Sequence, residues 1–142
     1  MKFTKTLTAL ALSGALAIGY WDFKDNTMEI SRKSEISKLP IKSSFCQRAD
    51  MNNNGLEDYV VAGPLVGEDK VAIYLLENKK THYEPKLLHD EIPLKNASFE
   101  LRDLNNDGLK DISIRGRTQI EKIRTHWKCF NLINKGAFYI QE

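Results

Sequence analysis

The chain has 142 residues, of which 28% are charged and 42% hydrophobic, and its formal net charge is +2 at pH 7. This length and balance indicate one small folded domain or two tightly joined repeats, and the low Pro and Gly content and small charge imbalance exclude a disordered chain. No apolar run reaches the roughly 18 residues that a membrane-spanning helix needs, so we expect no membrane span.

The first 17 residues have the order of a secretory signal peptide. Lys2 and Lys5 give a basic start, an apolar stretch follows, and Ala15 and Ala17 supply small residues before a cleavage point. An amphipathic N-terminal helix is the alternative. Cleavage would leave residues 18–142, and the loss of the two lysines would reduce 21 basic residues to 19, equal to the 19 acidic ones. We therefore expect a periplasmic or secreted protein, and a neutral chain argues against nucleic-acid binding.

Short strands are expected from the mature start to the first loop. Residues 21–24 and 28–36 are interpreted as one or two strands, and residues 41–45 as a strand that leads into a loop rich in Asp and Asn. The loop is followed by a β-branched and aromatic run that begins at Asp58, which is typical of a strand.

Hairpins complete each half of the chain. After the first loop, residues 71–76 and 81–88 are predicted as two strands joined by a polar turn. Residues 97–101 lead into a second Asp- and Asn-rich loop, and the run from Asp111 is again a strand. Residues 120–130 and 137–140 are predicted to form the last hairpin, with Trp127 and Tyr139 in the core.

The two loops have the same sequence pattern, 53 residues apart. Asp50-Met-Asn-Asn-Asn-Gly-Leu-Glu-Asp58 corresponds to Asp103-Leu-Asn-Asn-Asp-Gly-Leu-Lys-Asp111. Oxygens at positions one, three and five, with the carbonyl of position seven and the Asp at position nine, suit Ca²⁺, which takes six to eight oxygen ligands. Glycine at position six permits the sharp turn. The predicted calcium ligands are Asp50, Asn52, Asn54, Leu56 and Asp58, and Asp103, Asn105, Asp107, Leu109 and Asp111. Asx-rich turns that hold no metal are the alternative.

These loops are not complete EF-hands, because position twelve is Val61 or Ile114 rather than Glu. A nine-residue loop of this kind that runs into a strand resembles the calcium loop of FG-GAP/VCBS-type repeats, as in integrin-like β-propellers. The second loop matches better, since the first has Asn54 where the second has Asp107. The resemblance implies a mainly β, compact, propeller-like domain with few helices, built from two loop-strand-hairpin units at about residues 45–95 and 98–142.

The only two cysteines, Cys46 and Cys129, are predicted to form a disulfide, because an exported protein occupies an oxidising compartment. Two free thiols are the alternative. Partner-binding residues are expected in the turn-rich segments after the strands, where loops sit on a rigid sheet. They are Gly63, Pro64, Glu68, Asp69, Arg115 and Arg117. A solvated hairpin end is the alternative for the two arginines.

The functional hypothesis is a non-catalytic, calcium-binding exported domain that binds a protein partner. Small exported proteins similar to this repeat pattern include periplasmic inhibitors of lysozyme-like, cell-wall-degrading enzymes, some of them immunity proteins, and the resemblance implies such a hydrolase as partner. A calcium-dependent structural or adhesive module is the alternative. A metal-dependent hydrolase is disfavoured, because a filled oxygen shell leaves little room for an activated water.

Overall fold

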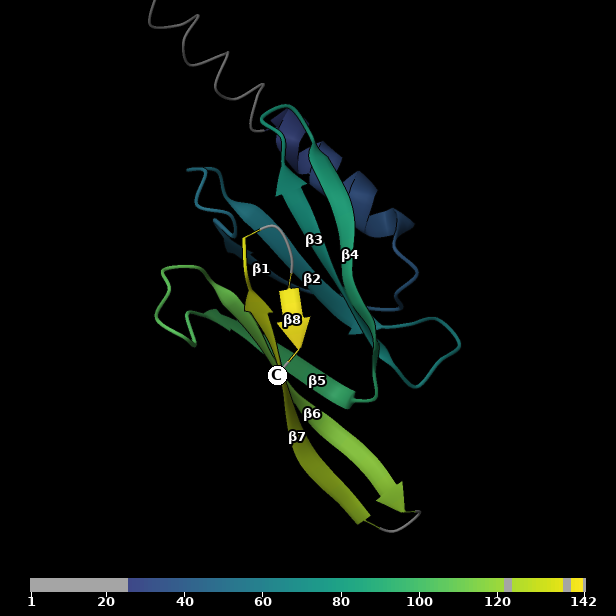
Figure 1. The fold of residues 1–142 in the computed structure, drawn as a ribbon. Helices are drawn as coiled ribbons and strands as arrows, with labels where there is room; N and C mark the ends of the chain where they lie inside the picture. Colours follow the sequence, from purple (N-terminus) through teal and green to yellow (C-terminus); the bar gives the residue numbers. More distant parts are fainter. Residues whose placement is uncertain (1–25, 122–123, 137–138, 142) are drawn as a thin grey trace, which may run out of the picture.

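The computed structural model describes residues 26–121, 124–136 and 139–141, so the predicted signal peptide and the predicted strand at 21–24 lie outside the described residues. Within them the chain forms one helical segment, residues 26–38, and eight strands (Figure 1). The strands are β1 (Phe45–Ala49), β2 (Asp58–Pro64), β3 (Val71–Asn78), β4 (Tyr83–Ile92), β5 (Lys95–Arg102), β6 (Asp111–Glu121), β7 (Arg124–Asn134) and β8 (Tyr139–Gln141).

The strands form two antiparallel sheets in which each strand pairs with the next along the chain. The first sheet has the order β1-β2-β3-β4 and the second has the order β5-β6-β7-β8. Each Asp- and Asn-rich loop joins the first strand of a sheet to the second. The predicted mainly β fold of repeated units is therefore confirmed.

One hydrophobic core lies between the two sheets. Alternate residues of β2 and β3, such as Val60 and Ile73, pack with Ile112 and Ile114 of β6 and Leu132 of β7, and all five are at most 2% exposed. Burial of apolar side chains from both repeats in a single cluster stabilises the pair as a unit. The side chain of Gln47 in β1 adds a polar link, because its Nε2 donates to the carbonyl of Phe99 in β5 at 2.6 Å.

The opposite face of the first sheet is covered by the helical segment. Val61, Leu76 and Tyr83 are buried there against Met28 and Ile36. The prediction of strands at 28–36 is wrong, because the segment is helical and its two packed apolar residues, Met28 and Ile36, are eight positions apart on one helix face. The segment also has charge pairs three and four residues apart, Glu29–Arg32, Glu29–Lys33 and Glu35–Lys38, which stabilise helices. No helix among the described residues is long and apolar enough to cross a membrane.

The last hairpin differs from its prediction. β6 continues to Glu121 and β7 begins at Arg124, so the predicted strand at 120–130 spans the end of a hairpin. Figure 1 shows β6 and β7 running together beyond the rest of the second sheet. The pairing extends from Ile112↔Leu132 to Glu121↔Arg124. Residues 119–126 include no Gly, Pro, Asn or Asp, so the sequence pattern did not indicate where β6 ends and β7 begins.

Candidate functional site

The first loop is held by hydrogen bonds from its own side chains to its own backbone. The two carboxylate oxygens of Asp50 accept the backbone N–H groups of Asn54 (3.1 Å) and Gly55 (2.8 Å). Asn52 Oδ1 accepts the same Asn54 N–H at 3.2 Å, and Asn54 Oδ1 accepts from Leu56 at 2.8 Å. The oxygens of positions one and three therefore converge on one amide.

The second loop repeats this pattern bond for bond. Asp103 accepts the N–H groups of Asp107 (3.2 Å) and Gly108 (2.9 Å), and Asn105 Oδ1 accepts the same Asp107 N–H at 3.1 Å. Asp107 Oδ1 accepts from Leu109 at 2.9 Å. The glycines at position six have φ of 82° and 89°, and the asparagines at position four have φ of 56° and 60°, so both loops need residues that tolerate left-handed backbone.

The aspartate at position nine plays a different part from the other loop acids. Asp58 and Asp111 are fully buried. Asp111 Oδ2 accepts the N–H of Leu104 at 2.7 Å, and Oδ1 accepts that of Asn134 at 2.8 Å. Asp58 makes the equivalent bonds to Met51 (3.1 Å) and Asn78 (2.8 Å). Each carboxylate thus connects the start of its loop to the end of the third strand of its own sheet, β3 for Asp58 and β7 for Asp111.

Two asparagines that the sequence analysis did not single out complete these connections. Asn78 and Asn134 end β3 and β7, and each donates its side-chain amide to the carbonyl before the position-nine Asp, Glu57 at 3.1 Å or Lys110 at 3.1 Å. Asn134 also donates to the carbonyl of Met51 at 2.6 Å. The sequence offered one sign of this shared role, because an Asn-Lys pair occurs at the end of both strands, at 78–79 and 134–135.

Burial and hydrogen bonding shift two of the loop carboxyls in opposite directions. Burial raises the pKa of Asp58, against the effect of the Asn78 and Met51 N–H groups. The N–H of Leu109, assisted by the amide of Asn105, lowers the pKa of Asp107. The exposed loop acid is therefore held in its charged form, whereas the buried one is less easily ionised.

The described residues contain no group of three or more His, Cys, Asp or Glu side chains placed to hold a metal ion. The predicted ligands of the first loop include only two acids, Asp50 and Asp58, and in both loops the oxygens of the position-nine aspartate accept backbone N–H groups. A calcium shell here would use asparagine and backbone oxygens beside one or two carboxylates, a donor set that Ca²⁺ accepts. The side-chain oxygens of positions one, three and five are of the type that this ion binds, and calcium binding stays a prediction.

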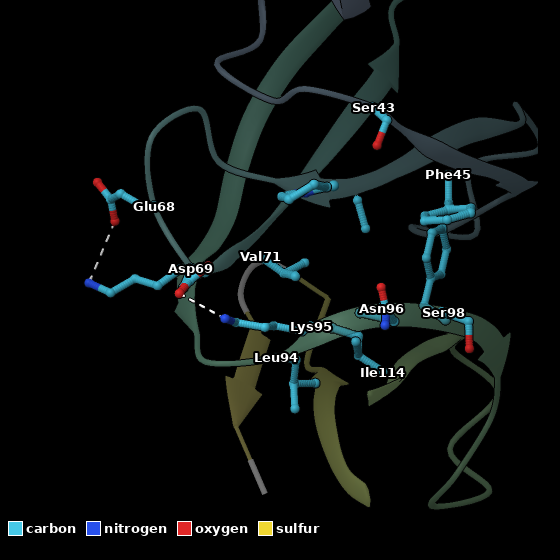
Figure 2. A pocket seen from close by; sticks show the side chains of 16 residues that line it. Ser43, Phe45, Glu68, Asp69, Val71, Leu94, Lys95, Asn96, Ser98 and Ile114 are labelled. Atoms are coloured by element: carbon cyan, nitrogen blue, oxygen red, sulfur yellow. Dashed lines mark ion pairs between the residues drawn. The ribbon is translucent and has the colours of Figure 1, made fainter. Parts of the chain in front are cut away.

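A groove of about 330 Å³ lies where the two sheets meet, and it collects four of the predicted partner-binding residues (Figure 2). Gly63, Pro64, Glu68 and Asp69 line it together with residues of β5 such as Asn96 and Ser98. At its rim, Lys95 pairs with Asp69 at 2.9 Å. Gly63 itself is buried, so its role here is to make room for backbone rather than to contact a partner.

Arg115 and Arg117 do not join this groove, and their predicted position in a turn is wrong. Both lie within β6, where Arg115 is paired with Ser98 and Cys129, and Arg117 with Trp127. The guanidinium of Arg117 lies over the Trp127 ring, 5.1 Å from its centroid. The prediction of a buried Trp127 is also wrong, because this side chain is 61% exposed, whereas Tyr139 packs against the core as expected.

The predicted disulfide is absent from the structure, in which Cys46 and Cys129 are free and exposed. Cys46 lies on β1 of the first sheet, and Cys129 lies on β7 of the second sheet, 3.3 Å from the hydroxyl of Ser113. β1 and β7 belong to different sheets and do not pair with each other. The expectation of an oxidising compartment was therefore not a sufficient reason to predict a bond between the two cysteines.

Comparison with known proteins agrees with the repeat geometry. A family model described as FG-GAP-like repeat matches residues 50–114. This segment begins at Asp50, the first residue of the first loop, and ends in β6 after the second loop. No curated protein and no solved structure matches the chain. Residues 50–114 are thus similar to FG-GAP-like repeats, and the resemblance predicted from the two loops is confirmed for this segment.

Proposed function

We propose that this β-rich repeat protein is an exported, non-catalytic module that binds calcium at its two loops and a protein partner at its surface. The calcium proposal is supported by one arrangement that occurs in both loops. Side-chain oxygens of Asp50 and Asn52 accept the same backbone N–H in the first loop, and those of Asp103 and Asn105 do so in the second. This preorganisation lowers the cost of ordering the loop around an ion.

The second loop would hold Ca²⁺ through Asp103, Asn105, Asp107 and the carbonyl of Leu109. The first loop would use the equivalent residues Asp50, Asn52, Asn54 and Leu56. The position-nine aspartates would contribute through water or would support the loop from behind, since Asp58 and Asp111 are fully buried beneath it. When bound, the ion would neutralise the carboxylates and stabilise the folded state.

Calorimetry on metal-stripped protein tests the calcium proposal. Added Ca²⁺ should release or absorb heat and raise the melting temperature, by a stabilisation of about 2.7 kcal/mol at a hundredfold excess over Kd. The double variant Asp103→Ala with Asp107→Ala should lose the stronger of two binding events. A wild-type protein that shows neither heat nor a shift in melting temperature refutes the proposal.

The partner that the family resemblance suggests is a lysozyme-like, cell-wall-degrading enzyme, which this protein would inhibit. The non-catalytic part of the proposal is supported by the loop acids, each of which is engaged in hydrogen bonds that shape the chain rather than aimed together at a reaction centre. A peptidoglycan-clearing assay with lysozymes and an excess of this protein tests inhibition. Undiminished clearing by every lysozyme tested, together with calcium binding, would favour a calcium-dependent structural or adhesive module.

A further inference from the structure

The outer face of the second sheet carries a group of exposed side chains that no described element covers. Arg115 and Arg117 of β6 lie directly beside Cys129 and Trp127 of β7, and these four residues are named here the arm face. The stacking of Arg117 on Trp127 fixes a cation beside a large aromatic surface. Tryptophan and arginine on a rigid support are the residues that most often dominate binding at protein interfaces.

The arginines of the arm face differ from Arg32, Arg48 and Arg102 in their charge partners. Arg32, Arg48 and Arg102 each pair with a glutamate of this chain. Among the described side chains, no carboxylate forms such a pair with Arg115 or Arg117. Glu100 of the neighbouring strand β5 is an acid on this face, and it pairs with Arg102 at 3.3 Å. The arm face therefore presents two positive charges that are available to carboxylates from outside.

The strand beside these arginines also has a largely unpaired edge. β7 pairs with β6 along its length, but β8 covers only Leu132, Ile133 and Asn134 of β7. In the first sheet, by contrast, the fourth strand β4, which corresponds to β8, pairs with β3 from Val71 to Asn78. Within the described residues, the first eight positions of β7 thus have no strand on that side. Such an edge offers backbone groups to an added strand.

We propose that the arm face docks an extended acidic segment of the partner protein, which adds as a strand to the edge of β7 and directs carboxylates to Arg115 and Arg117. This inference rests on the proposed function for the existence of a partner, and it adds where that partner binds and by what chemistry. The unpaired edge specifies an extended chain, the two arginines specify its acidic side chains, and Trp127 supplies apolar area beside them.

The two free cysteines allow a direct test. Cys129 belongs to the arm face and Cys46 to the first sheet, and both are exposed. We would measure the rate at which N-ethylmaleimide alkylates each thiol, by mass spectrometry, with and without a synthetic peptide of alternating glutamate and threonine. We expect the peptide to slow alkylation of Cys129 severalfold and to leave Cys46 unchanged. Equal protection of both thiols, or of neither, overturns the proposal.

Charge reversals on the two faces of the same hairpin provide the matched control. Arg115→Glu and Arg117→Glu should each lower peptide affinity at least about tenfold. Lys128→Glu changes the charge equally, but Lys128 is paired with Gly116 and lies on the opposite face, so affinity should hold. All three positions are exposed, and circular dichroism checks that each variant folds. An equal loss in the Lys128 variant overturns the proposal.

Two further probes distinguish other occupants. A peptide of alternating glutamate and proline has the same charge but cannot pair as a strand, so it should not protect Cys129. Protection by this peptide or by single-stranded DNA, to the same extent as by the glutamate-threonine peptide, would indicate simple anion binding and overturn the strand proposal. If the Arg115→Glu and Arg117→Glu variants still inhibit the partner, docking at the arm face is refuted and the proposed function stands.

Discussion

The side-chain amide of Asn134 donates to the carbonyl of Met51 at 2.6 Å, and this hydrogen bond joins the two repeats at their loops. Asn134 is fully buried and lies 83 residues from Met51 in the sequence. Within the described part of the chain, its counterpart Asn78 bonds to residues of the first repeat alone. The second repeat therefore holds the first loop in place, whereas no such bond from Asn78 reaches the second loop.

This asymmetry predicts different costs for the same substitution. Asn134→Ala leaves the buried carbonyl of Met51 and the partly buried carbonyl of Lys110 without their donor and should lower the free energy of unfolding by about 2–4 kcal/mol. Asn78→Ala removes the side-chain bonds to Glu57 and from Lys80 at an exposed site and should cost about 1 kcal/mol. Urea unfolding followed by circular dichroism measures both. Equal costs would contradict a structural link between the repeats through Asn134.

The position-nine aspartates are expected to matter for stability in the absence of any metal. Asp111→Ala deprives the N–H groups of Leu104 and Asn134 of their acceptor and should cost about 3 kcal/mol, measured by unfolding in the presence of a chelator. Asp103→Ala, in the exposed part of the same loop, is the control and should cost about 1 kcal/mol. A smaller cost for Asp111→Ala than for Asp103→Ala would contradict this structural role of Asp111.

Gly63 is expected to be required for packing rather than for partner binding. A Cβ at this position would overlap the carbonyl oxygen of Ser43, which is backbone and cannot swing aside. Gly63→Ala should therefore destabilise the protein by about 3 kcal/mol. Gly67→Ala meets no atom within 4 Å and should cost only about 1 kcal/mol, for its positive φ of 83°. Thermal unfolding compares the two variants, and similar melting temperatures would refute this role.

The two loops should differ in calcium affinity because of one residue. Asn54 occupies the position that Asp107 has in the second loop, so the second loop carries one more carboxylate. We expect Asn54→Asp to tighten the weaker of two binding events by about tenfold and Asp107→Asn to weaken the stronger by a similar factor. Calorimetric titration resolves the two events. Affinities that do not respond to either change would place the ion elsewhere.

Much of the candidate site could be read from the sequence because its interactions are local. The bonds that shape each loop join residues two to five positions apart, so the spacing of Asp, Asn and Gly predicts both the turn and the direction of its oxygens. The strands after each loop follow from β-branched residues in alternation. The helix at 26–38 was missed because its apolar positions are few and its stability depends on packing against Val61 and Leu76.

What the sequence determined by itself was a repeated, mainly β chain with two loops whose side chains fold back on their own backbone. Only the tertiary structure decided which groups from distant segments meet. It buried Asp58 and Asp111, set Asn134 against Met51, assigned Gly63 to packing and placed Arg117 beside an exposed Trp127. The physical reason is that these contacts depend on strand register and on the approach of one sheet to the other, and neither is encoded in local spacing.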